Sequence, residues 1–177
     1  QIAAVKKLVN QNDVLAARVV EGLRNRADIF LFIPNPSVVN KHTVPEGIGF
    51  NDYYSLAKYW WPNPESPNGR PYVYRDGEVN PECYSEISDL NRLDTFSEAT
   101  LLLSVAAFVT GDRSYAKKAS SLIHTWFVDQ TTRQTPHFRF EQIIPGRDEL
   151  RFQGLVESRR LIYVCEAIQL LQHLNAI

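Results

Sequence analysis

The stretch NDYYSLAKYWWPNPESPNGRPYVYRDGEVNP, residues 51–81, combines aromatic side chains with residues that interrupt regular structure. Seven of its thirty-one residues are aromatic, and five of these fall within the nine positions from Tyr53 to Trp61. It also holds five prolines and two glycines, which helices and central strands rarely accommodate. The composition predicts a long loop whose rings either pack against a folded body or remain available to a ligand.

Helical periodicity lies on both sides of this loop. Apolar residues recur at helical spacing in residues 2–10, 14–32, 90–109, 113–128 and 155–174. Asp13 and Asp112 are placed to cap the helices that follow them, and Gly111 is placed to end the helix before it. No segment shows convincing strand alternation, and no repeat recurs at a fixed period. We therefore expect an all-α protein of antiparallel helical hairpins joined by long loops.

Length and composition limit the number of domains and the classes of partner that the chain can have. A chain of 177 residues with 44% apolar residues predicts one domain with a real core, residues 1–177. The net charge of −1 favours neither nucleic acid nor an anionic membrane surface, and no apolar run approaches the ~20 residues that span a bilayer. The chain begins at Gln1 and contains no methionine, so we expect a mature or trimmed segment. The spacing of Cys83 and Cys165 does not decide whether they pair.

Four stretches carry a resemblance to a known family. They read YYSLAKYWWPNP (53–64), GRPYVYRDGEVNPE (69–82), VTGDRSYAKKASSLIHTWFVD (109–129) and EQIIPG (141–146). In this order they resemble the alginate lyases, helical-toroid enzymes that cleave alginate and related polyuronates. The resemblance covers nearly the whole chain and implies an incomplete (α/α) toroid, the N-terminal portion of such an enzyme, in a secreted or periplasmic protein.

The resemblance also implies where the chemistry lies. In the family, an Asn-His pair, a tyrosine and a nearby arginine carry the reaction, and the Asn-His pair belongs to a stretch such as NNHG. That stretch is not found in this sequence, and none of its four histidines follows an asparagine. We therefore expect this chain to supply mainly the wall that grips the substrate, and the missing C-terminal half of the fold to be a possible partner.

The candidate site residues follow from what cleavage of a polyuronate by β-elimination requires. The uronate carboxylate must be neutralised, a base must remove the proton on C5, and an acid must protonate the departing oxygen. We assign this chemistry to His137, Arg139 and Tyr54. Aromatic faces stack on pyranose rings, and forked polar groups hold carboxylates and hydroxyls. The predicted substrate-binding residues are Tyr53, Tyr59, Trp60, Trp61, Arg75 and Gln142.

Other classes of site have less support in the sequence. No cluster of His, Cys or carboxylate residues has the spacing of metal ligands, and no nucleophile motif is present, so we expect neither a metal nor a cofactor. The main expectation is a lyase acting on an acidic polysaccharide. Two alternatives stay open: a non-catalytic carbohydrate-binding helical protein, and a helical scaffold in which the aromatic loop is only packed core.

Overall fold

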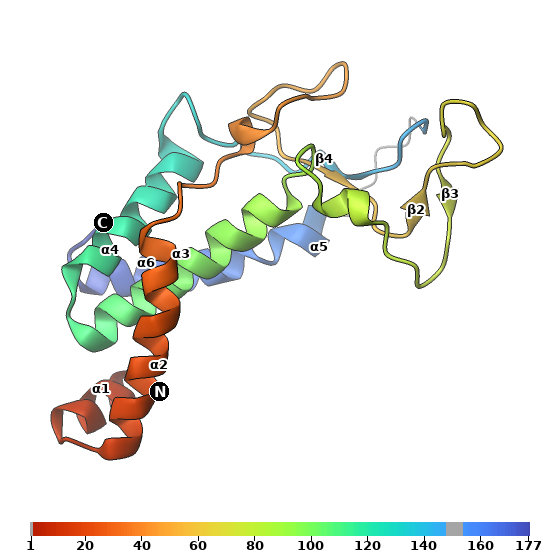
Figure 1. The fold of residues 1–177 in the computed structure, drawn as a ribbon. Helices are drawn as coiled ribbons and strands as arrows, with labels where there is room; N and C mark the ends of the chain where they lie inside the picture. The colour runs from red at the N-terminus through yellow and green to blue at the C-terminus, as the bar shows by residue number, and fades with distance from the viewer. Residues whose placement is uncertain (1, 148–153) are drawn as a thin grey trace. The chain divides into compact units, whose positions relative to one another are not determined.

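The computed structural model describes residues 2–147 and 154–177, and the chain is mostly helical (Figure 1). It divides into two compact units, and each unit is assembled from segments that are separate in the sequence. The first unit holds Gln1–Pro36, Thr95–Val128 and Arg160–Ile177, and the second holds Ser37–Asp94 and Asp129–Arg159.

The first unit is built from helices. They are α1 (Ile2–Asn10), α2 (Val14–Leu31), the greater part of α3 (Leu90–Thr110), α4 (Arg113–Ile123) with a π-helical continuation at His124–Val128, and α6 (Leu161–His173). The helices expected from periodicity are confirmed to within a few residues. One difference is at the end of the chain, where α5 (Gly154–Ser158) and α6 are two helices and not one.

The predicted helix boundaries have the expected local chemistry. The Asp13 carboxylate accepts a hydrogen bond from the Ala16 amide at 2.8 Å, and this caps α2. Asp112 accepts from the Ser114 amide at 2.9 Å and caps α4. Gly111, between α3 and α4, has φ +76°, the left-handed conformation in which glycine ends helices.

Helix α3 is the central apolar element of the chain. Phe96, on this helix, stacks its ring on that of Trp126, with centroids 4.6 Å apart and an interplanar angle of 6°. Both side chains are fully buried. By length and composition α3 is the one helix in the described part of the chain that could cross a membrane. More than half of that apolar window is buried within the protein, which is the environment of a core helix.

Helices α2 and α6 each leave some large apolar residues outside their buried face. In α6 the buried residues are Val164, Ala167 and Leu171, whereas Ile162 is 59% exposed. In α2 small residues are buried, and Leu15 is 72% exposed. Within the described residues, these helices therefore keep large apolar side chains in contact with solvent.

The second unit is made of loops, short strands and helical turns. Its elements are η1 (Val38–Asn40), β1 (Tyr54–Leu56), β2 (Trp60–Trp61), β3 (Val73–Tyr74), η2 (Pro81–Tyr84), the first turn of α3, β4 (Phe140–Ile143) and α5. The strands correct the all-α expectation: β1 pairs with β4 in parallel, and β2 pairs with β3 as an antiparallel hairpin. Strands of two to four residues are too short to show the alternation that predicts them.

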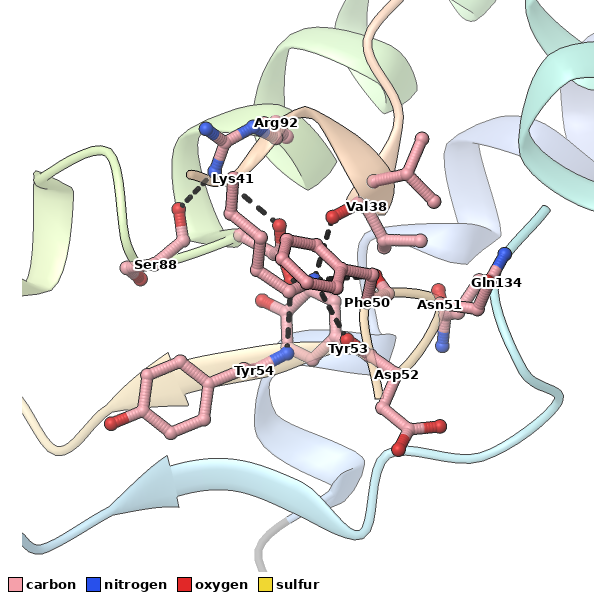
Figure 2. Close-up of polar contacts among 12 residues, drawn as sticks. Val38, Lys41, Phe50, Asn51, Asp52, Tyr53, Tyr54, Ser88, Arg92 and Gln134 are labelled. Carbon is pink, nitrogen blue, oxygen red and sulfur yellow. Dashed lines mark hydrogen bonds and ion pairs between the residues drawn. The ribbon is translucent and has the colours of Figure 1, made fainter. Parts of the chain in front are cut away.

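One buried cation holds this unit together. The Lys41 ammonium donates hydrogen bonds to the carbonyls of Val38 (2.6 Å), Phe50 (3.0 Å) and Asp52 (2.9 Å), which Figure 2 shows. It also donates to the Asp89 carboxylate at 2.7 Å. Both charged side chains are completely buried. The two cysteines are not paired with each other: Cys83 is buried and free, and Cys165, in α6, is exposed and free.

Replacing Lys41 tests how much this centre contributes. Lys41→Met should lower the free energy of unfolding by about 3–5 kcal/mol, because the Asp89 charge and three carbonyls lose their buried donor. Chemical denaturation followed by circular dichroism measures the change.

The control removes an exposed pair of the same kind. Arg26 and Glu98 lie 3.0 Å apart with side chains 67% and 57% exposed, so Arg26→Met should cost about 0–1 kcal/mol. Equal losses in the two variants would contradict the assigned role of Lys41.

Candidate substrate-binding site

The aromatic loop, residues 51–81, lies beside a second loop, residues 129–147, which holds the predicted site residues His137, Arg139 and Gln142. Strand β1 belongs to the first loop and β4 to the second, with Tyr54 opposite Phe140 and Leu56 opposite Ile143. Two residues separate Phe140 from Ile143, whereas only one separates Tyr54 from Leu56, so β4 bulges at Glu141 and Gln142. Bulges redirect side chains and are frequent beside active sites. Gln142 adopts φ +50°, a left-handed conformation that is uncommon for a residue with a Cβ.

Polar contacts fix the loop that precedes β4. The Thr135 amide donates to the Asn51 carbonyl at 2.8 Å, and the Asn51 side chain donates to the Arg133 carbonyl at 2.8 Å. His137 Nε2 lies 3.4 Å from an Asp52 carboxylate oxygen, and its Nδ1 accepts a long hydrogen bond from the Arg139 amide, also at 3.4 Å. The imidazole is 36% exposed and has a carboxylate that can orient it.

A buried carboxyl group lies beneath the bulge. Glu157, on α5, accepts hydrogen bonds from the Tyr53 and Ser55 hydroxyls, both at 2.7 Å. The Ser55 oxygen in turn accepts from the Gln142 amide at 2.9 Å. Burial raises the pKa of Glu157, and the hydroxyl donors oppose that rise. The contacts tie α5, β1 and the bulge of β4 together.

A second buried acid lies beside the first. Neither carboxylate oxygen of Glu141 has a hydrogen-bond partner of normal geometry among the described residues, and the side chain is fully buried. Burial, supplemented by the charge of Glu157, raises the pKa of Glu141 to about 8, although the Glu157 amide partly counteracts this. Glu141 is therefore protonated, and neutral, at neutral pH.

The raised pKa of Glu141 predicts a dependence of stability on pH. Between about pH 4.5 and 8 the folded protein keeps a proton that the unfolded chain has released, so the free energy of unfolding should fall as pH rises. Glu141→Gln should remove this part of the slope and raise stability at pH 8 by on the order of 2–4 kcal/mol relative to the parent. Urea denaturation across this range measures the slope.

The matched control for this measurement is Glu46→Gln, which changes an exposed carboxylate. It should leave the slope unchanged. Part of the slope should persist in Glu141→Gln because the pKa of Glu157 is also raised. A Glu141→Gln profile that superposes on the parent would show that Glu141 is ionised in the folded protein.

The β2–β3 hairpin separates the two neighbouring tryptophans. Adjacent strand residues point to opposite faces, and the contacts follow this rule. Trp60 pairs with Tyr74 across the hairpin, with ring centroids 5.5 Å apart. Trp61 is opposite Val73, and its indole N–H donates to the Glu78 carbonyl at 2.9 Å. The two indoles therefore lie on opposite faces of the hairpin.

Each tryptophan of the hairpin has an arginine over its ring. The Arg75 guanidinium lies 5.1 Å from the Trp61 ring centroid, and its charge also meets Glu78 at 3.6 Å. The Arg147 guanidinium lies 4.6 Å from the Trp60 ring centroid. Sequence reasoning missed Arg147, although its place immediately after the Pro145-Gly146 turn was an available signal.

A glycine allows the second loop to reach the hairpin. A Cβ on Gly146 would lie 2.8 Å from Cα of Pro71, closer than real Cβ contacts allow, and Gly146 has φ +81°. The Tyr72 amide donates to the Pro145 carbonyl at 3.0 Å, which fastens the turn to the segment just before β3. This close contact sets the position of the residue that follows, Arg147.

Gly146→Ala should destabilise the protein more than Gly77→Ala. Both glycines have positive φ, so both substitutions carry a similar conformational cost of about 1 kcal/mol. Only Gly146 meets backbone at 2.8 Å, whereas nothing lies within 4 Å of a Cβ at Gly77, so a further loss of about 1–3 kcal/mol is expected at Gly146. Thermal denaturation of both variants measures the difference, and equal losses would contradict the proposed packing.

Two predicted site tyrosines are buried rather than open to solvent. Tyr53 is fully buried, with its ring 4.8 Å from Phe138, so it offers no free face to a sugar in this arrangement. Tyr54 is 3% exposed and packs in an apolar cluster with Leu56 and Cys83. Burial raises the pKa of Tyr54 to about 12, so its phenol is protonated at neutral pH, the form that a general acid requires.

The other predicted residues remain in contact with solvent. Tyr59 is 41% exposed, and Arg139 is exposed with its guanidinium 5.8 Å from the Phe140 ring centroid. The second unit brings together all the predicted residues, in two groups. Tyr53, Tyr54, His137, Arg139 and Gln142 lie along or beside the β1–β4 pair, and Tyr59, Trp60, Trp61 and Arg75 belong to the β2–β3 hairpin.

Comparison with known proteins identifies the family. The family model described as alginate lyase matches residues 37–177, so the chain belongs to the alginate lyase family. The chain is also similar to the crystal structure of an alginate lyase from Bacteroides ovatus, with a TM-score of 0.88 and 34% sequence identity. The superposition covers 97% of this chain and 44% of that chain, so this chain spans less than half of that relative's length. No curated protein matches it.

Proposed function

We propose that this chain is the N-terminal portion of a polysaccharide lyase that cleaves a uronate-containing polysaccharide, alginate-like or a glucuronan, by β-elimination. The observation that carries the proposal is the parallel pairing of β1 with β4. It joins the two loops that carry the family's motifs, and these loops present exposed arginines beside aromatic rings. Membership of the alginate lyase family supports the reaction class.

The reaction makes a double bond between C4 and C5 of the uronate. A base takes the C5 proton, the electron pair forms the double bond, and the C4–O bond breaks as its oxygen gains a proton. Arg139 has an exposed guanidinium that can neutralise the uronate carboxylate. His137 is partly exposed and lies beside Asp52, and its imidazole can exchange a proton with the substrate. Gln142 can hold a hydroxyl from the bulge.

The hairpin supplies binding surface in this proposal. Partly exposed indole and phenol rings can cover the apolar faces of pyranose rings, and Arg75 beside Trp61 adds a positive charge that favours an acidic polymer. These contacts exist equally in the ground state and the transition state, so they contribute to affinity more than to the chemical step.

The remaining parts of the proposal concern the larger protein. We propose that these helices belong to an (α/α) toroid and that the other half of the fold is contributed by further sequence. The length ratio to the Bacteroides ovatus structure supports this. A polymeric substrate cannot cross a lipid bilayer, which supports action outside the cytoplasm, in a secreted or periplasmic protein.

The test is a pair of variants in the full-length protein, followed by absorbance of the unsaturated product. Trp61→Ala should raise KM roughly tenfold and change kcat little, because the stacking contact is uniform along the reaction. Arg139→Ala should lower kcat by about a hundredfold or more, because the carboxylate that it contacts gains further negative charge in the transition state as C5 loses its proton. Alginate, its mannuronate-rich and guluronate-rich fractions, and glucuronan are the substrates.

Two surface substitutions in the first unit are the matched controls. Phe32→Ala removes an aromatic ring that is 86% exposed, and Arg18→Ala removes an exposed guanidinium. Both should retain the parental constants. Full activity in Trp61→Ala and Arg139→Ala would place the site elsewhere. Binding without product from any polyuronate would favour the alternative, a non-catalytic carbohydrate-binding protein.

A further inference from the structure

We infer that one face of α2 is the surface on which the further sequence of the full-length protein docks, through a helix that packs closely against it. We call it the Leu15 face, and it consists of Leu15, Val19, Gly22 and Ile29. The inference rests on the proposed function only because it takes from it the further sequence that completes the fold. It concerns the first unit and none of the candidate site residues.

The Leu15 face is apolar and open to solvent. Its residues recur at positions i, i+4, i+7 and i+14, a spacing that puts them on one side of a helix. Leu15 is 72% exposed, Val19 is 56% exposed and Ile29 is 65% exposed. The residues that α2 buries within the chain are two alanines and one valine. The helix therefore turns larger apolar side chains away from the described chain, and such a face marks an interaction surface.

Gly22 lies in the middle of the Leu15 face. Apart from its own helical turn, nothing in the described chain lies within 4 Å of the Cβ that an alanine would place there, so no contact within the chain requires glycine. Glycine is unfavourable in the interior of a helix, because it loses more conformational freedom on folding than alanine does. It does allow another backbone to approach closely. The partner that fits this face is therefore a helix that crosses α2 at Gly22.

The relative of known structure supports the choice of partner. Its superposition covers 97% of this chain, so α2, with 18 residues, lies mostly within the matched part. The match covers 44% of that relative, so the greater part of that chain has no counterpart here. Further sequence in the same polypeptide has a high effective concentration at α2, which favours it over a separate molecule.

A second copy of the chain fits the Leu15 face less well. Two α2 helices packed antiparallel about a twofold axis at Gly22 would place Arg18 of one copy opposite Arg26 of the other. Arg26 has Glu98 at 3.0 Å, but among the described residues Arg18 has no acidic side chain within ion-pair distance. Like charges that face each other in an interface oppose association. The further sequence is therefore the occupant that these observations favour.

The test measures the exposure of this face in the full-length protein by cysteine labelling. Val19→Cys places a small apolar thiol side chain on the Leu15 face. Glu21→Cys, the matched control, places one at an exposed position of α2 outside that face. Maleimide labelling of the α2 peptide is read by mass spectrometry, in buffer and in urea. Val19→Cys should be labelled roughly tenfold or more slowly in the native protein than in urea, whereas the rate for Glu21→Cys should change little.

A second variant tests the close approach at Gly22. Gly22→Ala should lower the melting temperature of the full-length protein by roughly 2 °C or more, because the added methyl group meets the docked helix. On a face open to water the same substitution would raise the melting temperature, because alanine restricts the unfolded chain and favours the helix. Glu21→Ala is the control and should change the melting temperature by less than about 1 °C.

Three outcomes would overturn the inference. They are equal labelling of the two thiols, a higher melting temperature in Gly22→Ala than in the parent, and protection of Val19→Cys that is lost on dilution. The last would assign the Leu15 face to a second copy. These outcomes are distinct from failure of the proposed function, because the lyase assay reads product, whereas labelling and melting read the packing of α2. An inactive protein with a protected Leu15 face still supports the docking.

Discussion

The second unit depends on a single buried ammonium group. Lysine has three N–H donors, and the Lys41 ammonium meets four oxygen atoms, so one donor is shared. The acceptors come from three separate places in the sequence, and each loses a hydrogen bond if the ammonium is removed. Asp89, the charged acceptor, also accepts from the Tyr54 amide at 3.0 Å, at the start of β1. A loop segment without a regular lattice of backbone hydrogen bonds is thus organised by one side chain.

A second polar centre connects that scaffold to the candidate site. Glu157 joins α5 to β1 through two hydroxyls, and one of these, Ser55, continues to the Gln142 amide. The left-handed backbone at Gln142 is held by these contacts and by the bulge around it. Because Glu141 is neutral, it can be buried beside Glu157 without adding a second negative charge to the interior. The strained backbone that presents Gln142 is therefore supported by buried acids.

Helices and their ends could be predicted from the sequence, because capping and periodicity are local. Asp13, Gly111 and Asp112 act as expected, since each contact spans three residues or fewer. The strands could not be predicted, because β1 and β4 acquire their partners across more than eighty residues. The buried faces of α2 and α6 also depend on neighbours, and a periodic pattern cannot choose between two apolar faces.

Some features of the candidate site could likewise be predicted from the sequence, and others could not. The aromatic and arginine side chains of the two loops can be read from the sequence, and the β1–β4 pairing brings the two loops together. Sequence could not indicate that Tyr53 is buried, because that follows from Glu157, which is distant in the chain. That Trp60 and Trp61 lie on opposite faces could not be predicted either, because it follows only once both are known to belong to a strand. Arg147 was missed because only the folded structure shows that its guanidinium lies over the Trp60 ring of the other loop.

The order of segments along the chain has a consequence for how the protein reaches its native state. The second unit cannot be completed until residues 129–159 have returned to residues 37–94, and the helical segment Thr95–Val128 lies between them. Closing so long a loop is entropically costly while the intervening chain is unfolded, and cheaper once local helices have shortened it. Formation of α3 and α4 should therefore precede the joining of β1 to β4, which makes the candidate site one of the last parts of the molecule to assemble.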